Sequence, residues 1–245
     1  MRFYPLTSVL VTLTLALGSH QDPLALALGG KKLIIVTTTD WNSSRGTLTR
    51  YELVNDKWRK VSQPIPVVVG RNGLAWDPAL TRKTPGSYLG PTKHEGDGRA
   101  PAGAFPLQRG TFGMAPSLEG SRRYIPLTPS IECVDDPGSR YYGRIVDRMQ
   151  IADVDWKSSE KMASIPEYRW GVVVNYNMDQ PVRGDGSCIF LHQWDGPDSS
   201  TAGCTAMAGD HIAEIVRWVN GDSRAILVQL PEPEYQRLRA HWQLP

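Results

Sequence analysis

The chain has 245 residues, with 27 Lys and Arg against 25 Asp and Glu, so its formal net charge is only +2. Hydrophobic residues make up 40% and charged residues 21%, which excludes a disordered chain and one embedded largely in a membrane. No basic stripe is present, so nucleic-acid binding is not indicated. The 23 glycines and 19 prolines favour a mainly β protein with a few short helices, and the length favours one domain.

The first residues have the pattern of an export signal. Met1-Arg2 is a short positive start, residues 9–17 are apolar, and Ala16 and Gly18 are small residues placed for cleavage. We therefore predict a signal peptide at 1–18 and a linker at 19–30, with a buried N-terminal helix or a retained anchor as the alternatives. The apolar run is short for a bilayer. The expected location is periplasmic or extracellular, with no stable membrane insertion after cleavage.

The chain contains three cysteines, Cys133, Cys188 and Cys204. In an oxidising compartment three cysteines divide into a pair and one remaining thiol. Cys188 lies in an apolar run and Cys133 in a polar segment, so we predict a Cys133–Cys188 disulfide and a free Cys204. Spacing alone does not fix the pairing, and three free thiols remain the alternative.

Four short strands are predicted in the first part of the chain. Residues 32–39 are β-branched and apolar, and residues 47–53, 58–61 and 66–70 follow at short spacing. Turn residues separate them, so the pattern predicts a sheet built from hairpins.

Strands alternate with short helices in the second half. Strands are predicted at 170–177 and 186–192, paired antiparallel, and at 224–230. A helix is predicted at 210–219, capped by Asp210, because its apolar residues recur at helical spacing on one face. A serine cap indicates a second short helix at 156–162.

Two other segments have no regular pattern. Residues 133–150 are polar and aromatic, which suits a lid or a binding wall as well as a structural loop. The residues from 232 to 245 are predicted to be a tail or a short terminal helix.

A glycine-punctuated loop at 93–105 carries four charged residues, Lys93, Glu95, Asp97 and Arg99. Glycine permits backbone geometries that hold charges at fixed positions beside a ligand. A solvated turn is the simpler interpretation of this segment alone.

A candidate nucleophile and base follow near residue 200. His192 ends an apolar run, and Cys204 follows Gly203 among small residues. A thiol needs a neighbouring base and backbone N–H groups facing the developing oxyanion, which the amides of Gly203 and Cys204 could supply. A buried core histidine is the alternative for His192. No ligand cluster or phosphate-binding loop is present, so no metal and no cofactor are predicted.

Three segments in order resemble the L,D-transpeptidase catalytic domain of the YkuD type. They are Gly96 to Phe105, like G-x-x-x-T-P-x-G-x-F; Ile189 to His192, like the strand ending in the catalytic histidine; and Thr201 to Cys204, like [S/T]-x-G-C. The resemblance implies a catalytic β-sandwich-like fold over residues 31–231. Ala202 stands where the family often has a second histidine, and Ala206 and Met207 where a polar residue is common.

The resemblance implies a chemistry on peptidoglycan stem peptides. Cys204 would attack a stem-peptide carbonyl to form a thioester, His192 would take the thiol proton, and the acyl group would pass to an amine or to water. Transfer and hydrolysis (carboxypeptidase or amidase) both remain open, as does a non-catalytic wall-binding module. Lys93, Glu95, Asp97 and Arg99 would contact the substrate, and the oligomeric state is not indicated.

Overall fold

A computed structural model describes residues 30–107, 110–118, 121, 123–220 and 224–245. The predicted signal peptide at 1–18, and the linker up to residue 29, lie outside the described residues. No helix in the described part of the chain is both long and apolar enough to cross a bilayer.

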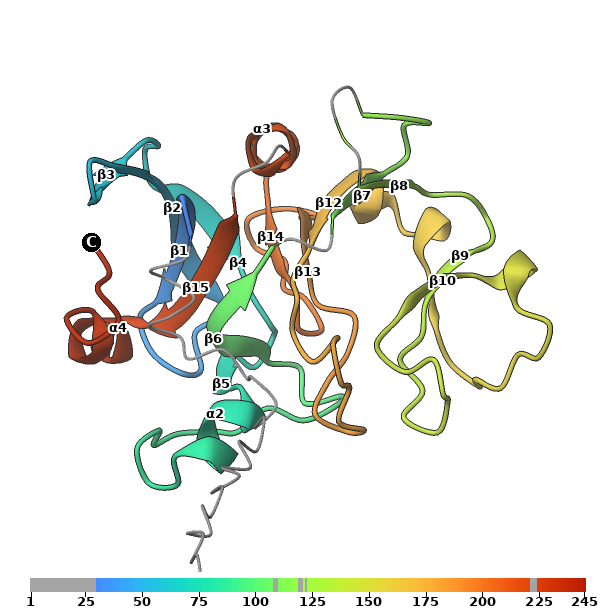
Figure 1. Ribbon diagram of the computed structural model, residues 1–245, viewed down its shortest axis with the longest axis horizontal. Coiled ribbons are helices and arrows are strands. Elements are labelled where there is room, and N and C mark those ends of the chain that lie inside the picture. The colour runs from blue at the N-terminus through green and yellow to red at the C-terminus, as the bar shows by residue number, and fades with distance from the viewer. Residues whose placement is uncertain (1–29, 108–109, 119–120, 122, 221–223) are drawn as a thin grey trace, which may run out of the picture.

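Most strands belong to one large sheet, which Figure 1 shows at the centre of the molecule. Its members are β1 (Lys32–Thr38), β2 (Arg45–Val54), β3 (Lys57–Lys60), β4 (Ile65–Val68), β5 (Leu74–Trp76), β6 (Ala100–Pro106), β7 (Thr111–Gly113), β8 (Tyr124–Pro126), β12 (Trp170–Val173), β13 (Phe190–Gln193), β14 (Thr205–Met207) and β15 (Ala225–Pro231). The order is β5-β6-β15-β1-β2-β4-β14-β13-β12-β7-β8, with β3 beside β2. The predicted mainly β fold class is therefore confirmed.

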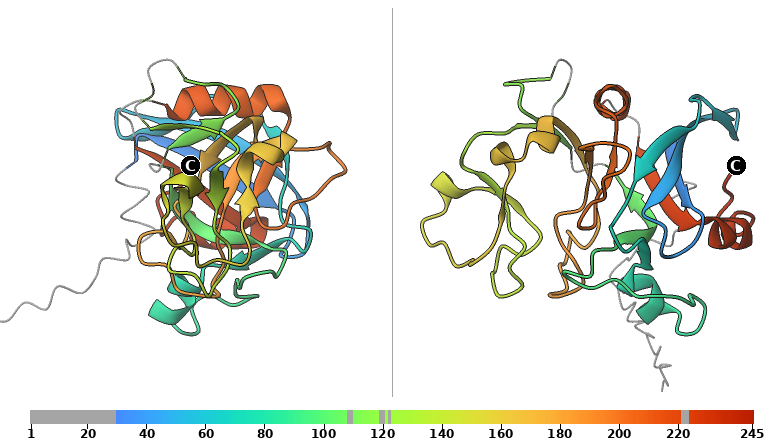
Figure 2. Two further views of the ribbon diagram at one scale, coloured as in Figure 1. Left: turned by 90° about the vertical axis from the view of Figure 1, so that its right-hand side faces the viewer. Right: turned by 180° about the vertical axis from the view of Figure 1, so that it is seen from behind.

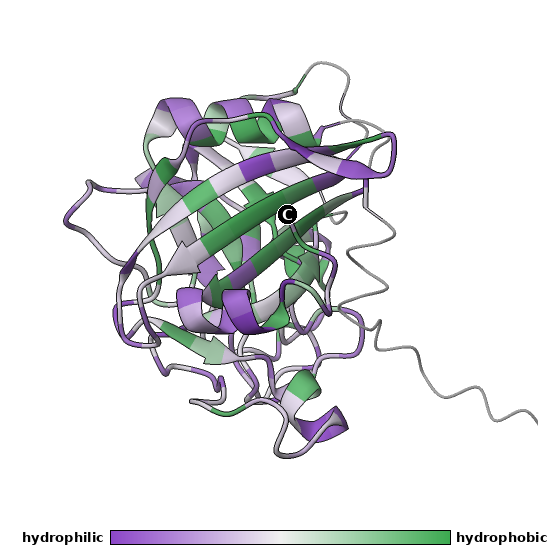
Figure 3. Ribbon diagram, turned by 90° about the vertical axis from the view of Figure 1, so that its left-hand side faces the viewer, coloured by the Kyte–Doolittle hydropathy of each residue, from purple (hydrophilic) through white to green (hydrophobic). Residues whose placement is uncertain are grey.

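Two long neighbouring strands of this sheet, β1 and β15, are almost entirely buried. β1 pairs antiparallel with β2, as the hairpin pattern predicts, and parallel with β15, with Lys32 opposite Ala225. Every residue of β15 is buried. Continuous apolar runs are typical of strands covered on both faces. Figure 3 shows these long strands as the most hydrophobic part of the ribbon.

Within the described residues, three α-helices lie around the sheet. They are α2 (Pro78–Lys83), α3 (Gly209–Val219) and α4 (Glu232–Leu238). α3 buries the predicted apolar face, but its N-cap is Ala208, and Asp210 lies inside the first turn. After α4, Trp242 is 1% exposed and packs in the main core. The predicted tail is therefore a terminal helix followed by a packed end.

A second, three-stranded sheet lies to one side of the large one, as Figure 1 and the right view of Figure 2 show. β9 (Ile131–Cys133) is its central strand, flanked by β10 (Ile145–Asp147) and β11 (Glu160–Lys161). Short 3-10 helices follow its two outer strands. The helix η1 (Arg148–Gln150) follows β10, and the helices η2 (Met162–Ser164) and η3 (Pro166–Arg169) follow β11.

The helix predicted at 156–162 is wrong. Residues 156–159 are irregular, Glu160 and Lys161 form β11, and Met162 begins a 3-10 helix. The Trp156 indole and the Ser159 hydroxyl both donate to Glu132 Oε2, over 2.9 and 2.7 Å. The serine hydroxyl therefore binds a neighbouring strand instead of capping a helix.

The loop predicted at 93–105 is partly wrong, because the buried strand β6 begins at Ala100. The strand predicted at 186–192 is shorter than expected and begins at Phe190. Its antiparallel pairing with β12 is confirmed, with Leu191 opposite Val172.

The predicted disulfide joins Cys133 to Cys188, and Cys204 is the free cysteine. Cys188 has a φ of 54°, an unusual backbone conformation for a residue other than glycine. All three cysteines belong to a second apolar cluster that also contains Phe112, Phe190 and Tyr168, separate from the main core. This second cluster holds Cys204, the predicted nucleophile.

Candidate active site

Cys204 directly precedes β14, which pairs in parallel with β13. This pairing sets Leu191 opposite Thr205 and His192 opposite Ala206. The Cys204 sulfur therefore lies beside β13, where the Phe190 amide donates to Sγ over 3.3 Å. The sheet register, and not sequence proximity, brings the cysteine to the histidine strand.

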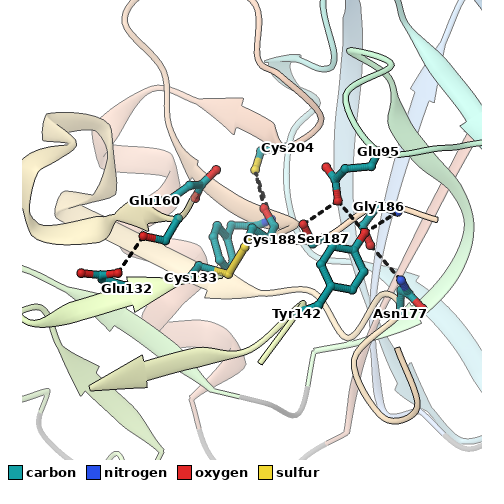
Figure 4. The surroundings of a disulfide bond; sticks show 12 residues. Glu95, Glu132, Cys133, Tyr142, Glu160, Asn177, Gly186, Ser187, Cys188 and Cys204 are labelled. Atoms are coloured by element: carbon teal, nitrogen blue, oxygen red, sulfur yellow. Dashed lines mark hydrogen bonds between the residues drawn. A yellow bond between two sulfur atoms is a disulfide. The ribbon is translucent and has the colours of Figure 1, made fainter. Parts of the chain in front are cut away.

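The Cys204 thiol is almost enclosed, with 7% of the residue exposed. Its sulfur donates to the Cys188 carbonyl over 3.4 Å, as Figure 4 shows. Burial raises the pKa of the thiol, and the nearby charge of Glu160 raises it further. The Phe190 amide, Tyr168 and Lys93 lower the pKa of Cys204 by smaller amounts. The resting group is a neutral thiol that needs a base.

His192 is buried and holds one defined tautomer. Its Nδ1 lies 2.6 Å from the Gln193 carbonyl oxygen. A carbonyl only accepts, so Nδ1 carries the proton and Nε2 keeps its lone pair. Burial lowers the pKa of His192, while the Gln193 contact and the charge of Glu167 oppose that change. The imidazole is therefore neutral near neutral pH and able to accept a proton at Nε2.

His192 and Cys204 line the same pocket, whose volume is about 210 Å³. Its walls come from η3, from the end of β13 and from the segment between β13 and β14. The other lining residues are Glu160, Ile165, Glu167, Tyr168, Trp194, Asp195, Ser199, Ser200, Thr201, Ala202 and Ala206. A buried thiol and a neutral imidazole in one polar-rimmed pocket are the elements of nucleophilic catalysis.

Gly203 belongs to the Thr201–Cys204 motif and lies against Arg99 of the Gly96–Phe105 motif. A side chain at this position would come within 3.1 Å of the Arg99 carbonyl oxygen. The Gly203 amide donates to Thr201 Oγ1 over 3.1 Å, and the Thr201 hydroxyl donates to the Cys204 carbonyl over 2.6 Å. The glycine thus permits close approach of the 93–99 segment to the nucleophile turn.

Two of the four predicted substrate-binding residues form a buried ion pair. Lys93 Nζ lies 2.6 Å from Asp97 Oδ1, and their side chains are 3% and 5% exposed. Asp97 also accepts from the amides of His94 and Arg99, over 2.9 and 2.8 Å. Asp97 therefore holds the backbone of its own loop.

The other two also bind the protein itself. Glu95 Oε2 accepts from the hydroxyls of Tyr142 and Ser187, over 2.5 and 2.7 Å. The Arg99 guanidinium donates to the Trp41 and Leu74 carbonyls and to Asn42 Oδ1. None of the four lines the pocket of Cys204 and His192.

Sequence reasoning missed Glu160 and Tyr168, which line the pocket. Tyr168 donates to Glu160 over 2.6 Å, and its ring lies edge-to-face against His192 at 5.1 Å between centroids. Burial raises the pKa of Glu160 to about 7. Only an isolated glutamate and an isolated tyrosine appear in the sequence there, so no motif could have found them.

Among the described residues, no group of three or more His, Cys, Asp or Glu side chains could hold a metal ion. The reactive groups that line the pocket are a thiol, an imidazole, a phenol and carboxyl groups.

Fold and site together define a mainly β protein with a cysteine–histidine site on paired parallel strands. Residues 37–228 match the family model of the L,D-transpeptidase catalytic domain, YkuD. The chain belongs to this family, as the three sequence motifs predict. A comparison with curated proteins finds no match.

Two solved structures of the helical cell shape determining protein Pgp2 from Campylobacter jejuni are similar to this chain. The native form is 13% identical with a TM-score of 0.37, and a point mutant is 14% identical with a TM-score of 0.36. Each match covers 82% of this chain, and 48% and 47% of those chains. The chain therefore spans about half the length of the solved structures it matches.

Proposed function

We propose that this protein is a cysteine-dependent acyltransferase that acts on peptidoglycan stem peptides. The observation that carries the proposal is the shared pocket of the Cys204 thiol and the neutral His192 imidazole. Membership of the L,D-transpeptidase catalytic-domain family supports the choice of wall peptides as substrates.

In the proposed first half-reaction, Cys204 Sγ attacks a stem-peptide carbonyl and the terminal D-amino acid leaves. His192 Nε2 is the acceptor for a proton, because its Nδ1 is held by Gln193. The Cys204 amide is the candidate oxyanion donor, and the Gly203 amide joins it only if its contact with Thr201 opens.

In the second half-reaction the thioester passes to an amine of another stem or to water. The rim of the pocket includes Asp195, Ser199 and Ser200, whose polar groups can hydrogen-bond an amine or a water. Transfer is the proposal, and hydrolysis is the competing outcome of the same assay. This function requires export, because the peptidoglycan wall lies outside the cytoplasm.

The test is incubation of the purified protein with a defined disaccharide-tetrapeptide, with products identified by mass. Transpeptidation gives a cross-linked dimer, and carboxypeptidase activity gives a disaccharide-tripeptide. Cys204→Ala should lower turnover by at least about a thousandfold, because the nucleophile is lost. Equal turnover by wild type and Cys204→Ala, or binding without any product, would remove the enzyme proposal.

A further inference from the structure

Among the described residues, the candidate active-site pocket is lined by three carboxylic acids and by no lysine or arginine. The acids are Glu160, Glu167 and Asp195, and two aromatic side chains, Tyr168 and Trp194, form further parts of the wall. Carboxylates attract a cation through their charge, and aromatic rings attract it through their faces. The lining therefore favours a positively charged ligand group and repels a negatively charged one.

Two of the three carboxyl groups are free to bind a ligand. Glu160 already accepts from the Tyr168 hydroxyl over 2.6 Å. Within the described residues, the side chains of Glu167 and Asp195 have neither a hydrogen bond nor an ion pair. Glu167 is half-buried and Asp195 is exposed. Their oxygen atoms are therefore available to a donor that enters the pocket.

The buried histidine gives independent evidence that the pocket receives a ligand. His192 is 8% exposed, and its Nδ1 is held by the Gln193 carbonyl oxygen. Its Nε2 has no hydrogen-bond partner among the described residues, yet protein atoms do not enclose it. Because His192 lines the pocket, Nε2 opens on it and can accept from a donor there.

The two free carboxyl groups reach this pocket from separate elements. Glu167 lies on η3 directly before Tyr168, whose ring centroid is 5.1 Å from that of His192. Asp195 lies just after β13, the strand that carries His192. Because the pocket volume is only about 210 Å³, a cation held by either acid lies close to the Cys204 nucleophile.

An ammonium held by these acids is not the amine that attacks the thioester. A neighbouring carboxylate stabilises the protonated form of an amine, and a protonated amine has no lone pair with which to attack. The acids therefore suit an ammonium that takes no part in the reaction. On a stem peptide, such a group close to Cys204 belongs to the side chain of the residue whose carbonyl is attacked.

We propose that the pocket binds this side chain and selects one that ends in an ammonium group without a free carboxylate, with Glu167 as its main partner. The substrate class is a stem peptide with a lysine-like residue, or a diamino acid whose side-chain carboxyl group is blocked, before the bond that breaks. The inference deepens the proposed function and rests on it for the peptide. The same acids would repel a carboxylate beside the ammonium, and the described lining has no lysine or arginine to hold it.

The first measurement compares the turnover of three disaccharide-tetrapeptides that differ only in the residue before the bond that breaks. This residue is lysine, norleucine or diaminopimelate, whose side chains end in an ammonium, in a methyl group, or in an ammonium beside a carboxylate. Wild type should prefer the lysine peptide to each of the others by about tenfold in kcat/KM, the size of one partly screened charge pair. Equal or faster turnover of the diaminopimelate peptide would overturn the proposal.

Glu167→Gln should lower the ratio of kcat/KM for the lysine peptide over the norleucine peptide by about tenfold. The loss should fall on KM, because the contact holds the side chain before and during the reaction. The norleucine peptide should react within about twofold of its wild-type rate, which a distorted active site would not allow. Asp195→Asn should lower the ratio by about threefold, since Asp195 is exposed. If Glu167→Gln fails to fold, Asp195→Asn decides.

Asp198→Asn is the matched control. It removes a carboxylate from the same segment between β13 and β14, but Asp198 pairs with Arg45, is 84% exposed and does not line the pocket. Its preference for lysine over norleucine should stay within about twofold of wild type. An equal fall in preference for Asp198→Asn and Glu167→Gln would mean a general charge effect, and the proposal would be wrong.

A second measurement needs no wall peptide. It compares the rates at which a cationic and an anionic methanethiosulfonate, which carry a trimethylammonium or a sulfonate group, modify the Cys204 thiol. Cys204 is the free cysteine, so one thiol reports. The ratio of the cationic to the anionic rate should fall about threefold or more in Glu167→Gln, and also in wild type at about 0.5 M NaCl, because salt screens the charge. An unchanged ratio in Glu167→Gln would contradict the proposal.

The two measurements separate this inference from the proposed function. A reagent ratio that depends on Glu167, without turnover of any tetrapeptide by wild type, would keep the cation preference of the pocket and reject the acyltransferase. Turnover of tetrapeptides with reagent and substrate preferences that do not depend on Glu167 would do the reverse.

Discussion

Glu160 and Glu95 lie on opposite sides of the disulfide (Figure 4), and each accepts a hydrogen bond from a tyrosine. On one side Tyr168 donates to Glu160 over 2.6 Å, and on the other Tyr142 donates to Glu95 over 2.5 Å. Burial raises the pKa of both phenols.

The neighbours of each pair make the difference. Tyr168 lines the pocket of Cys204 and lowers the pKa of its thiol. Tyr142 instead accepts from the Gly186 amide over 3.1 Å, and Glu95 accepts from Ser187, so this pair ties the chain before the disulfide to the 93–99 loop. The two pairs have the same chemistry but different positions, because one lines the pocket of Cys204 and the other supports a loop.

The largest change in stability should come from Asp97→Ala, on the structural side. It leaves the Lys93 ammonium buried without its partner, so the free energy of unfolding should fall by about 3–5 kcal/mol. Asp198→Ala is the control, since its pair with Arg45 is 84% and 65% exposed and should change stability by less than about 1 kcal/mol. Urea unfolding measures both. Equal losses of unfolding free energy in the two variants would mean that burial of the Lys93–Asp97 pair does not make it more important for stability than an exposed pair.

On the catalytic side, Glu160→Gln should change how stability depends on pH. The pKa of Glu160 is raised in the folded state from 4.5 to about 7. The unfolded chain therefore loses this proton first, so wild type loses stability as the pH rises from 4.5 to about 7. Relative to Glu160→Gln, the loss should be on the order of 3 kcal/mol. Urea unfolding of both proteins from pH 4.5 to about 7 gives the difference in their unfolding free energies. If that difference did not change with pH, the raised pKa of Glu160 would be contradicted.

The smallest effect is expected for Tyr142→Phe. The change removes a donor to Glu95 and an acceptor for the Gly186 amide, which should cost about 1–2 kcal/mol of unfolding free energy. Thermal or urea unfolding gives the value. If Tyr142→Phe stayed folded but lost most of its tetrapeptide turnover, the Tyr142–Glu95 pair would support activity as well as the loop.

The long strands and the main helix could be predicted because burial leaves a periodic pattern. β1 and β15 are continuous apolar runs, and α3 repeats its apolar residues along one face. The parallel pairing of β1 with β15 has no local signal, because the two strands meet only in the folded sheet.

The small sheet was missed because its strands are too short to show alternation. β9 and β10 have three residues each and β11 has two. Their stability comes from side chains, such as the bonds of Trp156 and Ser159 to Glu132. The serine that resembles a helix cap is one of these contacts, which explains the error there.

The nucleophile and the histidine could be proposed from sequence, but their surroundings could not. The motif around Cys204 is local, whereas Glu160 lines the pocket from β11 of the small sheet. The charges of the 93–99 loop were visible, yet sequence does not reveal that Lys93 and Asp97 neutralise each other.

The left-handed backbone at Cys188 bears on how the protein could be engineered. Its φ of 54° is one that glycine adopts without steric cost. A version without the bridge, for production in a reducing host, should therefore combine Cys133→Ala with Cys188→Gly instead of two alanines. Glycine would relax the backbone there and keep the carbonyl that faces the Cys204 sulfur.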